Sequence, residues 1–454
     1  MEHPTSHAQR VARLVEQFQA IPPDAPVRLA KKTSNLFRQR AATTAPGLDV
    51  TSFTHVLHVD PVARTASVEG MVTYEQLVDA TLPYGLMPLV VPQLKTITLG
   101  GAVTGLGIES SSFRNGCPHE SVSEMEILTG DGRVIVARAD NEHADLFHAF
   151  PNSYGTLGYA LRLEIELEPV KAFVALRHLR FREPGPLFAE MARLCTERTL
   201  DGRPVDFVDG TVFSRDELYL TVGTFVDEAT HLSDYTWTEI YYRSLQSKAE
   251  DFLTTRDYLW RWDTDWFWCS RAFGAQKKWV RRLAGRRFLR SDVYWKIVAF
   301  ERRTHLNARI EKLRGLAPRE DVVQDIEVPI GRAEEFCEFF LRDIPIEPFW
   351  ICPLRQRDPD AEWPLYRFTD SLYVNFGFWS TVPLAPGQAD GDHNQLIERV
   401  VDGLGGRKSL YSTSFYSEDE FWRLYNGPAY EVVKKTYDPE ARLLDLYAKC
   451  VRNR

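Results

Sequence analysis

The chain has 454 residues, of which 44% are hydrophobic and 26% charged, and its formal net charge is −8. A chain of this length can bury two or more hydrophobic cores, so we expect more than one domain. The acidic balance argues against a general nucleic-acid-binding protein.

Three features of the sequence indicate in which part of the cell the protein is expected. The six cysteines form no Cys-x-x-Cys pair, so we expect no metal site and reduced thiols, as in a cytosolic protein. Residues 10–18 predict a polar amphipathic helix rather than a signal peptide. No run approaches the ~18 apolar residues of a membrane span. We therefore expect a protein that is soluble or bound at a membrane surface.

The first third of the chain predicts short strands alternating with helices. A helix is expected over residues 73–82, ended by Tyr84-Gly85, and the turn Gly130-Asp131-Gly132 predicts a hairpin. Asp145-Leu146-Phe147 precedes Gly155-Thr156-Leu157-Gly158. Apolar and polar patterning predicts strands at 27–29, 56–60, 65–69, 123–128, 133–137 and 159–168.

Residues 98–116 form the most informative segment of the chain. Gly100, Gly101, Gly105 and Gly107 lie within eight residues and are followed by Ser110-Ser111-Ser112. Such a backbone can approach a ligand closely and present N–H and hydroxyl donors to a diphosphate. The spacing matches neither the Rossmann fingerprint nor the P-loop, so a bound nucleotide requires a different fold.

Several sequence blocks together resemble one flavoprotein family. They are Gly-Gly-x-x-x-Gly-x-Gly-Ile-Glu-Ser-Ser-Ser at 100–112, Asp145-Leu146-Phe147, Gly155-Thr156-Leu157-Gly158, Val322-Val323-Gln324-Asp325 with Val328-Pro329, and Glu420-Phe421-Trp422. The family is that of vanillyl-alcohol oxidase and p-cresol methylhydroxylase. Within it, the chain resembles the Δ24-sterol reductases and the bacterial 10-methylene fatty acyl reductases of the tuberculostearate pathway.

The resemblance implies an α+β fold with a two-part FAD-binding domain of p-cresol methylhydroxylase type. We expect that domain at residues 1–170 and an α+β substrate-binding cap domain at 171–394. The boundaries fall near Glu168-Pro169-Val170 and in the Pro/Gly/Asp-rich loop 383–392. The resemblance also places the C-terminal segment, 395–454, back on the FAD-binding domain.

Two loops are expected to hold the FAD. The early loop lacks a histidine between residues 31 and 40, the residue through which many relatives attach FAD, so we expect a noncovalent cofactor. The residues expected at the cofactor are Lys32, Thr33, Ser34 and Asn35, then Thr98, Gly100, Gly101, Thr104, Gly105, Gly107, Ile108, Glu109, Ser110, Ser111 and Gly116, and lastly Gly155 and Gly158.

The middle of the chain combines aromatic and basic residues. Residues 258–268 are rich in Trp and Tyr, and residues 277–290 carry seven basic side chains and no acidic one. This pattern suits the interface of an anionic membrane, although a solvated helix beside core aromatics would look similar. The expected membrane contacts are Trp279, Arg281, Arg282, Arg286 and Arg287.

The resemblance implies reduction of an isolated carbon–carbon double bond, which needs an acid that stays protonated in a dry pocket. The candidates are Asp325, Tyr416, Glu418 and His305. Each has a structural alternative. Asp325 could pair with an arginine, Tyr416 could belong to the core, Glu418 could cap a helix, and His305 could lie on a solvated helix.

The resemblance leaves the substrate open. We expect a 10-methylene fatty acyl chain on a membrane phospholipid, reduced to the 10-methyl chain with NADPH as the electron donor, by an enzyme at the cytoplasmic face of the cell membrane. The alternatives are a Δ24-sterol reductase, an FAD-dependent alcohol or lactone oxidase, and a lipid-binding protein without activity.

Overall fold

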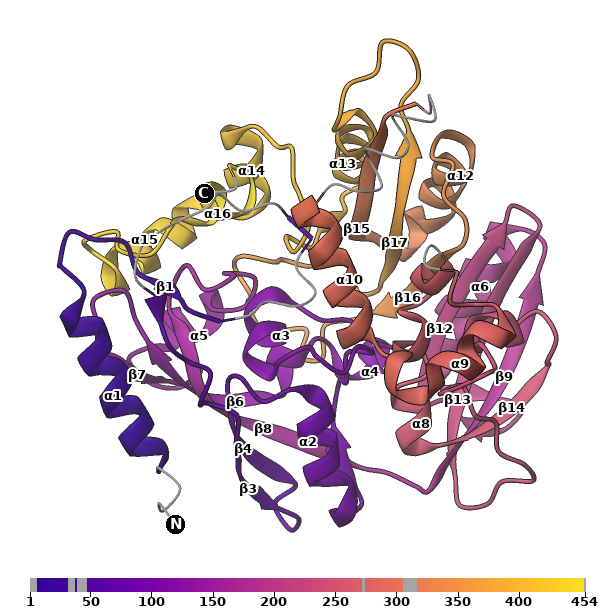
Figure 1. Cartoon of the computed structure of the whole chain (residues 1–454), viewed down its shortest axis with the longest axis horizontal. Coiled ribbons are helices and arrows are strands. Elements are labelled where there is room, and N and C mark those ends of the chain that lie inside the picture. Colours follow the sequence, from indigo (N-terminus) through magenta and orange to yellow (C-terminus); the bar gives the residue numbers. More distant parts are fainter. Residues whose placement is uncertain (1–5, 32–36, 39–46, 272–273, 305–316, 453–454) are drawn as a thin grey trace.

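A computed structural model describes residues 6–31, 37–38, 47–271, 274–304 and 317–452. Its strands form two main antiparallel sheets, one from the first third of the chain and one from the remainder (Figure 1). Helices and sheets are mixed throughout, so the α+β prediction is confirmed.

The first sheet carries the strands that the sequence predicted. Its central strand is β8 (Tyr159–Pro169), whose distal end also pairs with β5 (Leu86–Pro88). In spatial order the sheet contains β3 (Val56–Asp60), β4 (Thr65–Glu69), β8, β6 (Val122–Leu128) and β7 (Val134–Ala137). The short strands β1 (Arg28–Leu29) and β2 (Gly47–Leu48) pair separately and in parallel.

The second sheet follows directly after β8 and belongs to the cap. Its order is β14 (Glu250–Thr254), β9 (Phe173–Phe181), β13 (Glu217–Val226), β12 (Phe207–Ser214), β16 (Phe349–Leu354), β17 (Tyr373–Pro383), β15 (Arg319–Pro329) and β18 (Arg407–Lys408). The small pair β10 (Thr199–Leu200) and β11 (Arg203–Pro204) lies outside it.

Helices surround both sheets. Side-chain caps begin several of them: Ser6 and Gln9 form a capping box on the first helix, and Thr73 and Gln76 form another on the second. The helices that the structure describes are α1 (His7–Ala20), α2 (Tyr74–Thr81), α3 (Leu99–Gly105), α4 (Ser112–Asn115), α5 (Ala144–Ala149), α6 (Pro184–Glu197), α7 (Tyr241–Ser244), α8 (Thr255–Leu259), α9 (Lys278–Phe288), α10 (Ser291–Thr304), α12 (Ala333–Asp343), α13 (Asp392–Gly403), α14 (Glu418–Leu424), α15 (Gly427–Tyr437) and α16 (Leu446–Cys450).

The cap extends beyond the boundary expected at residue 394. That position lies inside α13, which packs against β15, and β18 then pairs with the same strand. After β18 the chain crosses to the first unit, where the Lys434 ammonium donates to the Thr156 carbonyl oxygen and the Val27 N–H donates to the Arg442 carbonyl oxygen. Figure 1 shows α14 to α16 in yellow above the first sheet.

The aromatic run 258–268 lies in the interior rather than at the surface. Trp260, Trp262, Trp266 and Trp268 are all buried. They belong to a hydrophobic core that continues from the first sheet into the cap. Because this core is shared, the two units are packed together along the surface between their sheets.

Candidate active site

A cavity of about 630 Å³ lies between the two units. One wall comes from the glycine-rich segment and from β8, and the opposite wall comes from β15, β16 and β17 of the cap. A site between two domains suits a cofactor on one side and its reaction partner on the other.

The glycine-rich segment forms a tight cradle on its side of the cavity. The Thr98 hydroxyl accepts from the Gly101 N–H at 3.2 Å at the start of α3, and the Gly100 N–H donates to the Gly70 carbonyl at 3.0 Å. A Cβ on Gly100 would lie 2.7 Å from that carbonyl oxygen, so glycine is required there. The expected cofactor residues that line the cavity are Thr98, Gly100, Gly101, Thr104, Gly105, Gly107, Ile108, Gly155 and Gly158.

Four other residues expected at the cofactor lie outside the cavity lining. Glu109 and Ser110 are buried and hydrogen-bonded to each other, and the Ser111 hydroxyl donates to the Leu89 carbonyl oxygen. Gly116 follows α4 with φ of 72°. The remaining four, Lys32, Thr33, Ser34 and Asn35, lie outside the described residues.

Glu109 instead belongs to a buried charge network that joins the two units. The fully buried Arg261 guanidinium lies 3.1 Å from the Glu109 carboxylate and 2.8 Å from that of Asp209, and the Trp350 indole N–H also donates to Asp209. Burial raises the pKa of Glu109. Removing Arg261 would leave two buried carboxylates without a counter-charge, so this network fixes the cap against the glycine-rich segment.

Cationic side chains also line the cavity. They are Arg28, Lys31, Arg38 and Lys449, the last from α16. Arg38 is 5% exposed and donates through Nη1 to the Leu410 carbonyl, while its Nε and the Nε2 of the buried Gln93 have no partner among the described residues. Cations, buried donors and a glycine cradle are the groups that an FAD diphosphate requires, so these residues fit FAD.

Asp325 faces the cavity from β15. Gly377 lies opposite it on β17, where any Cβ would collide with its carboxylate. Tyr411 hydrogen-bonds to the Asp325 carboxyl and also accepts from the Trp379 indole N–H at 2.8 Å. No cation pairs with Asp325 among the described residues, and burial raises its pKa to about 7. Asp325 therefore retains a proton over much of the range below neutral pH.

The other acid candidates lie elsewhere. Tyr416 is buried against the Tyr425 ring, and Glu418 is exposed and pairs with Arg452 at 2.6 Å. Neither lines the cavity, and His305 lies outside the described residues. Of the candidates that the structure describes, Asp325 is therefore the one placed to meet a bound molecule.

A second buried acid, which the sequence did not indicate, lies two residues further along β15. Glu327 is fully buried and hydrogen-bonded to the Tyr366 and Ser409 hydroxyls. Burial raises its pKa to about 8, but Glu327 does not line the cavity.

Aromatic side chains form the cap wall around Asp325. Trp266, Phe267, Trp350 and Trp379 all line the cavity, and the Phe267 and Trp379 rings lie 4.3 Å apart between centroids. This wall excludes water and favours an apolar ligand.

The basic segment 277–290 is only partly exposed. Arg281 is buried, where its Nη1 contacts the Asp265 carboxylate at 2.6 Å. The expectation that Arg281 contacts a membrane is therefore wrong, because its charge is neutralised inside the cap. Trp279, Arg282, Arg286 and Arg287 are exposed.

Comparison with known families identifies the class of protein. Residues 5–138 match the family described as "FAD binding domain". The match covers α1 to β7 and includes the glycine cradle. With its cap and shared cavity, the protein is an FAD-dependent oxidoreductase.

The chain is also similar to relatives that cover most of its length. The chain is 26% identical to the "Delta(24)-sterol reductase" of Arabidopsis thaliana, over 90% of this chain and 77% of that protein. It is also 26% identical to the Homo sapiens "Delta(24)-sterol reductase", over 87% and 75% of the two chains. A more distant likeness is "Cytokinin dehydrogenase 4" of Oryza sativa subsp. japonica, 22% identical over 80% and 68%.

Two kinds of feature are absent from the described residues. No helix among them is long and apolar enough to cross a membrane. Nor do these residues contain a group of three or more His, Cys, Asp or Glu side chains that could hold a metal ion.

Proposed function

We propose that the protein reduces an isolated, branched carbon–carbon double bond of a lipid, with Asp325 as the proton donor. The observation that carries the proposal is that Asp325, a carboxyl with a pKa of about 7, faces the same cavity as the glycine cradle. The relatives named Delta(24)-sterol reductase support the reaction class.

Reduction of an isolated double bond adds a hydride to one carbon and a proton to the other. FAD, when bound and reduced, supplies the hydride from its N5 atom. Since Trp379 donates to the Tyr411 oxygen, the Tyr411 hydroxyl is free to donate to the Asp325 carbonyl oxygen. The acidic O–H of Asp325 then remains available to the substrate.

The aromatic wall assists this proton transfer. Protonation of a branched olefin places positive charge on a tertiary carbon, which the faces of aromatic rings attract. Phe267, Trp350 and Trp379 lie on the wall that also carries Asp325. Exclusion of water keeps the carboxyl protonated and prevents hydration of the cationic carbon.

As substrate we favour a 10-methylene fatty acyl chain on a phospholipid, which would give the 10-methyl chain. Its 1,1-disubstituted double bond forms a tertiary cation on protonation. We propose noncovalent FAD and NADPH as the reductant. The names of the relatives favour a second candidate, the Δ24 double bond of a sterol.

The proposal is tested with purified protein, NADPH and each of the two lipids under anaerobic conditions, with products separated by gas chromatography. We expect the 10-methyl product from the wild type. Asp325→Asn should lower the rate about 10²–10⁴-fold, the usual contribution of a general acid, while the flavin still becomes reduced.

Glu327→Gln is the matched control, since it removes a buried carboxyl from the same strand without changing the cavity lining. This variant should keep most of the activity. Reduction of the sterol alone would transfer the proposal to the second candidate, and equal activity of Asp325→Asn and wild type would exclude Asp325 as the proton donor.

A further inference from the structure

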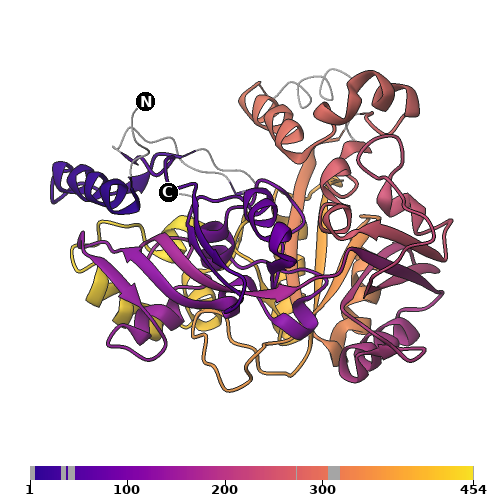
Figure 2. The same cartoon turned by 90° about the horizontal axis from the view of Figure 1, so that it is seen from below.

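The helices α9 and α10 carry large apolar side chains that nothing in the described structure covers. Trp279 is 62% exposed, Leu283 80%, Phe288 58% and Ile297 41%. We call these four residues the α9–α10 patch. In Figure 2 the two helices, in salmon, project together from the upper right edge of the molecule.

The backbone of α9 explains why these side chains face outward. Trp279 and Leu283 are four residues apart and therefore share one side of the helix. Gly285, with φ of 67°, interrupts the helix before Phe288. Arg281 turns inward to Asp265, which anchors the opposite side of α9 in the cap. The apolar side is therefore held in solvent by the fold.

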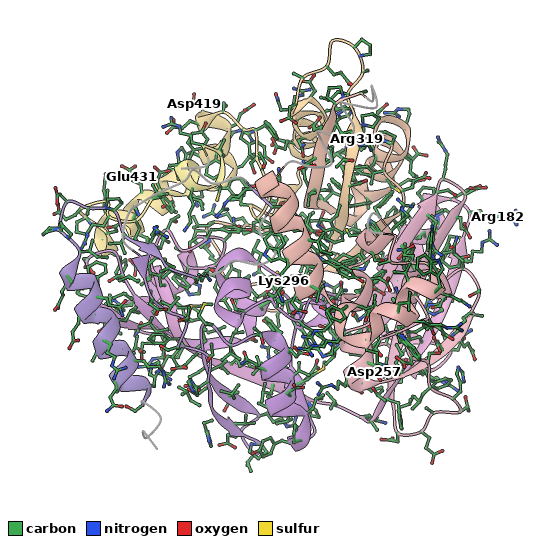
Figure 3. The ribbon with its side chains drawn as sticks, in the orientation of Figure 1. Arg182, Asp257, Lys296, Arg319, Asp419 and Glu431 are labelled. Atoms are coloured by element: carbon green, nitrogen blue, oxygen red, sulfur yellow. The ribbon has the colours of Figure 1, made fainter. Side chains whose placement is uncertain are left out.

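The charges around the patch are basic. Lys277, Lys278, Arg282 and Arg287 are exposed and form no ion pair with any described residue. Lys296 of α10, labelled in Figure 3, is 75% exposed and 4.0 Å from Asp292. Arg286, in contrast, is neutralised by Asp234 at 2.5 Å. Apolar residues ringed by Lys and Arg match the interface of an anionic bilayer, where each cation adds about 1 kcal/mol.

Helix α10 lies one layer from the cavity. The Trp295 ring of α10 packs against Phe37 and Trp266, with centroids 5.9 Å and 6.3 Å away, and both of those residues line the cavity. The Tyr294 hydroxyl also donates to the Thr264 carbonyl oxygen at 2.9 Å. One side of α10 thus packs against the cavity wall, while Ile297 on the same helix is exposed.

We propose that the α9–α10 patch docks the protein on the surface of an anionic phospholipid bilayer, at the cytoplasmic face of the membrane. Docking brings the aromatic wall of the cavity next to the lipid phase. The role of this contact in supplying substrate rests on the proposed function, whereas the contact itself does not.

Co-sedimentation with vesicles tests the contact. The probes are vesicles of phosphatidylcholine alone and of phosphatidylcholine with 30% phosphatidylglycerol. We expect wild type to pellet with the anionic vesicles and to be released by salt. Leu283→Ser/Phe288→Ser and Arg282→Glu/Arg287→Glu should each weaken binding at least tenfold.

Arg182→Glu/Arg342→Glu is the control for charge, because it makes the same change at exposed arginines outside the patch. It should bind like wild type. Equal pelleting of wild type and Arg282→Glu/Arg287→Glu would overturn the proposal, and so would failure of wild type to pellet. A dimer that forms without vesicles and is lost in Leu283→Ser/Phe288→Ser would assign the patch to a second copy of this chain.

Assays of lipid reduction distinguish the membrane contact from the proposed enzymatic function. The patch variants should reduce lipid dispersed in detergent at the wild-type rate and lose at least tenfold on lipid in anionic vesicles. An equal rate for wild type and patch variants on vesicles would overturn the role in substrate supply. Absence of product from wild type in both assays would count against the proposed function. Co-sedimentation would still test whether the α9–α10 patch binds the bilayer.

Discussion

At the scale of single residues, the proposed proton transfer depends on Asp325. A carboxyl group with an ordinary pKa would be ionised at neutral pH and could not donate a proton. Burial beside the aromatic wall raises the pKa of Asp325 to about 7. Gly377 leaves the space that its carboxylate occupies, and Tyr411 fixes its orientation.

This environment predicts the pH dependence of the chemical step. The protonated form of Asp325 predominates below its pKa of about 7 and is lost as the pH rises above it. The rate at which olefin reoxidises prereduced flavin should therefore be constant at low pH and fall about tenfold per pH unit above ~7. Stopped-flow absorbance from pH 5.5 to 9 measures this rate. A rate that rises with pH would contradict the assignment of Asp325 as acid.

The sequence indicated part of this site. The glycines and Thr98 were expected from a local motif, and Asp325 from a resemblance. Arg28, Arg38 and Lys449 were missed, because each is a single basic residue in a different part of the chain and only the fold brings them together. Glu109 was expected at the cofactor, but its partner Arg261 is 152 residues away in sequence. Asp209, the second carboxylate that binds Arg261, is 100 residues away from Glu109.

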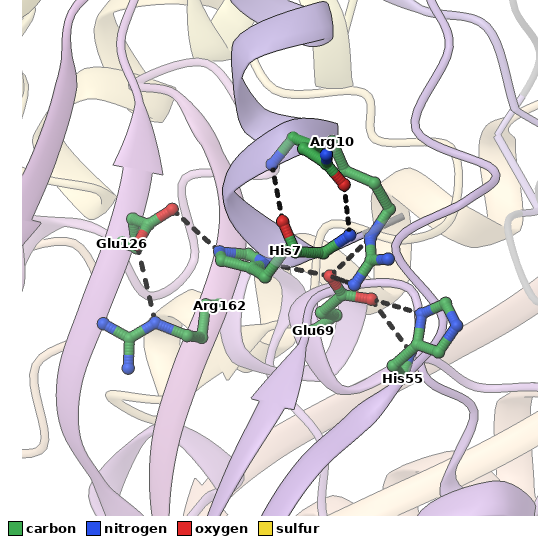
Figure 4. A network of polar contacts seen from close by, with 8 residues as sticks. His7, Arg10, His55, Glu69, Glu126 and Arg162 are labelled. Carbon is green, nitrogen blue, oxygen red and sulfur yellow. Dashed lines mark hydrogen bonds and ion pairs between the residues drawn. The ribbon is translucent and has the colours of Figure 1, made fainter. Parts of the chain in front are cut away.

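At the scale of elements, α1 shows how the FAD-binding unit is braced. His7 contacts the Glu69 carboxylate at 2.7 Å and that of Glu126 at 3.0 Å, while Arg10 and His55 also bind Glu69 (Figure 4). Glu69 directly precedes Gly70, which lines the cavity. This ionic cluster therefore fixes α1 beside the cofactor cradle.

The cluster predicts a pH-dependent stability. Burial alone would lower the pKa of His7, but hydrogen bonds and charges from Glu126 and Glu69 raise it to about 9. The contribution of protonated His7 is thus complete below pH ~6.5 and is lost as the pH rises through about 9. Thermal unfolding should show that His7→Gln is less stable than wild type at pH 6 and equally stable at pH 10.

His58→Gln provides the control. His58 is exposed on β3, the strand that pairs with β4, and β4 carries Glu69. Its effect on the unfolding temperature should be small at both pH values. An equal loss for His7→Gln at pH 6 and pH 10 would show that the ionic contacts of His7 do not stabilise α1.

Helix α9 shows where sequence patterning fails. Residues 277–290 were expected to present basic side chains to a membrane, and this expectation treated Arg281 like the other arginines of the segment. The buried Asp265 gives Arg281 a structural role instead. This buried partner does not follow from the sequence pattern, because it depends on the tertiary packing of the cap.

At the scale of the whole molecule, the α+β class and the first sheet followed from the sequence. Alternation of apolar and polar residues predicts strands, and turn residues predict their ends. Both are local patterns that can be recognised without the tertiary fold. The extent of the cap did not follow, since α13 and β18 lie beyond a loop that resembles a domain boundary but pack on β15. Residues of both units line the cavity, and α16 near the C-terminus contributes Lys449.

We propose that this FAD-dependent oxidoreductase delivers a hydride and a proton to an isolated lipid double bond. The most direct test mixes chemically prereduced protein anaerobically with 10-methylene phospholipid in D₂O, and follows flavin absorbance and product mass in a single turnover. We predict that the flavin reoxidises as one product forms per flavin, and that the product carries deuterium at the carbon that Asp325 protonates. Bound flavin that stays reduced with both the methylene lipid and the Δ24 sterol would contradict the proposal that the protein reduces an isolated lipid double bond.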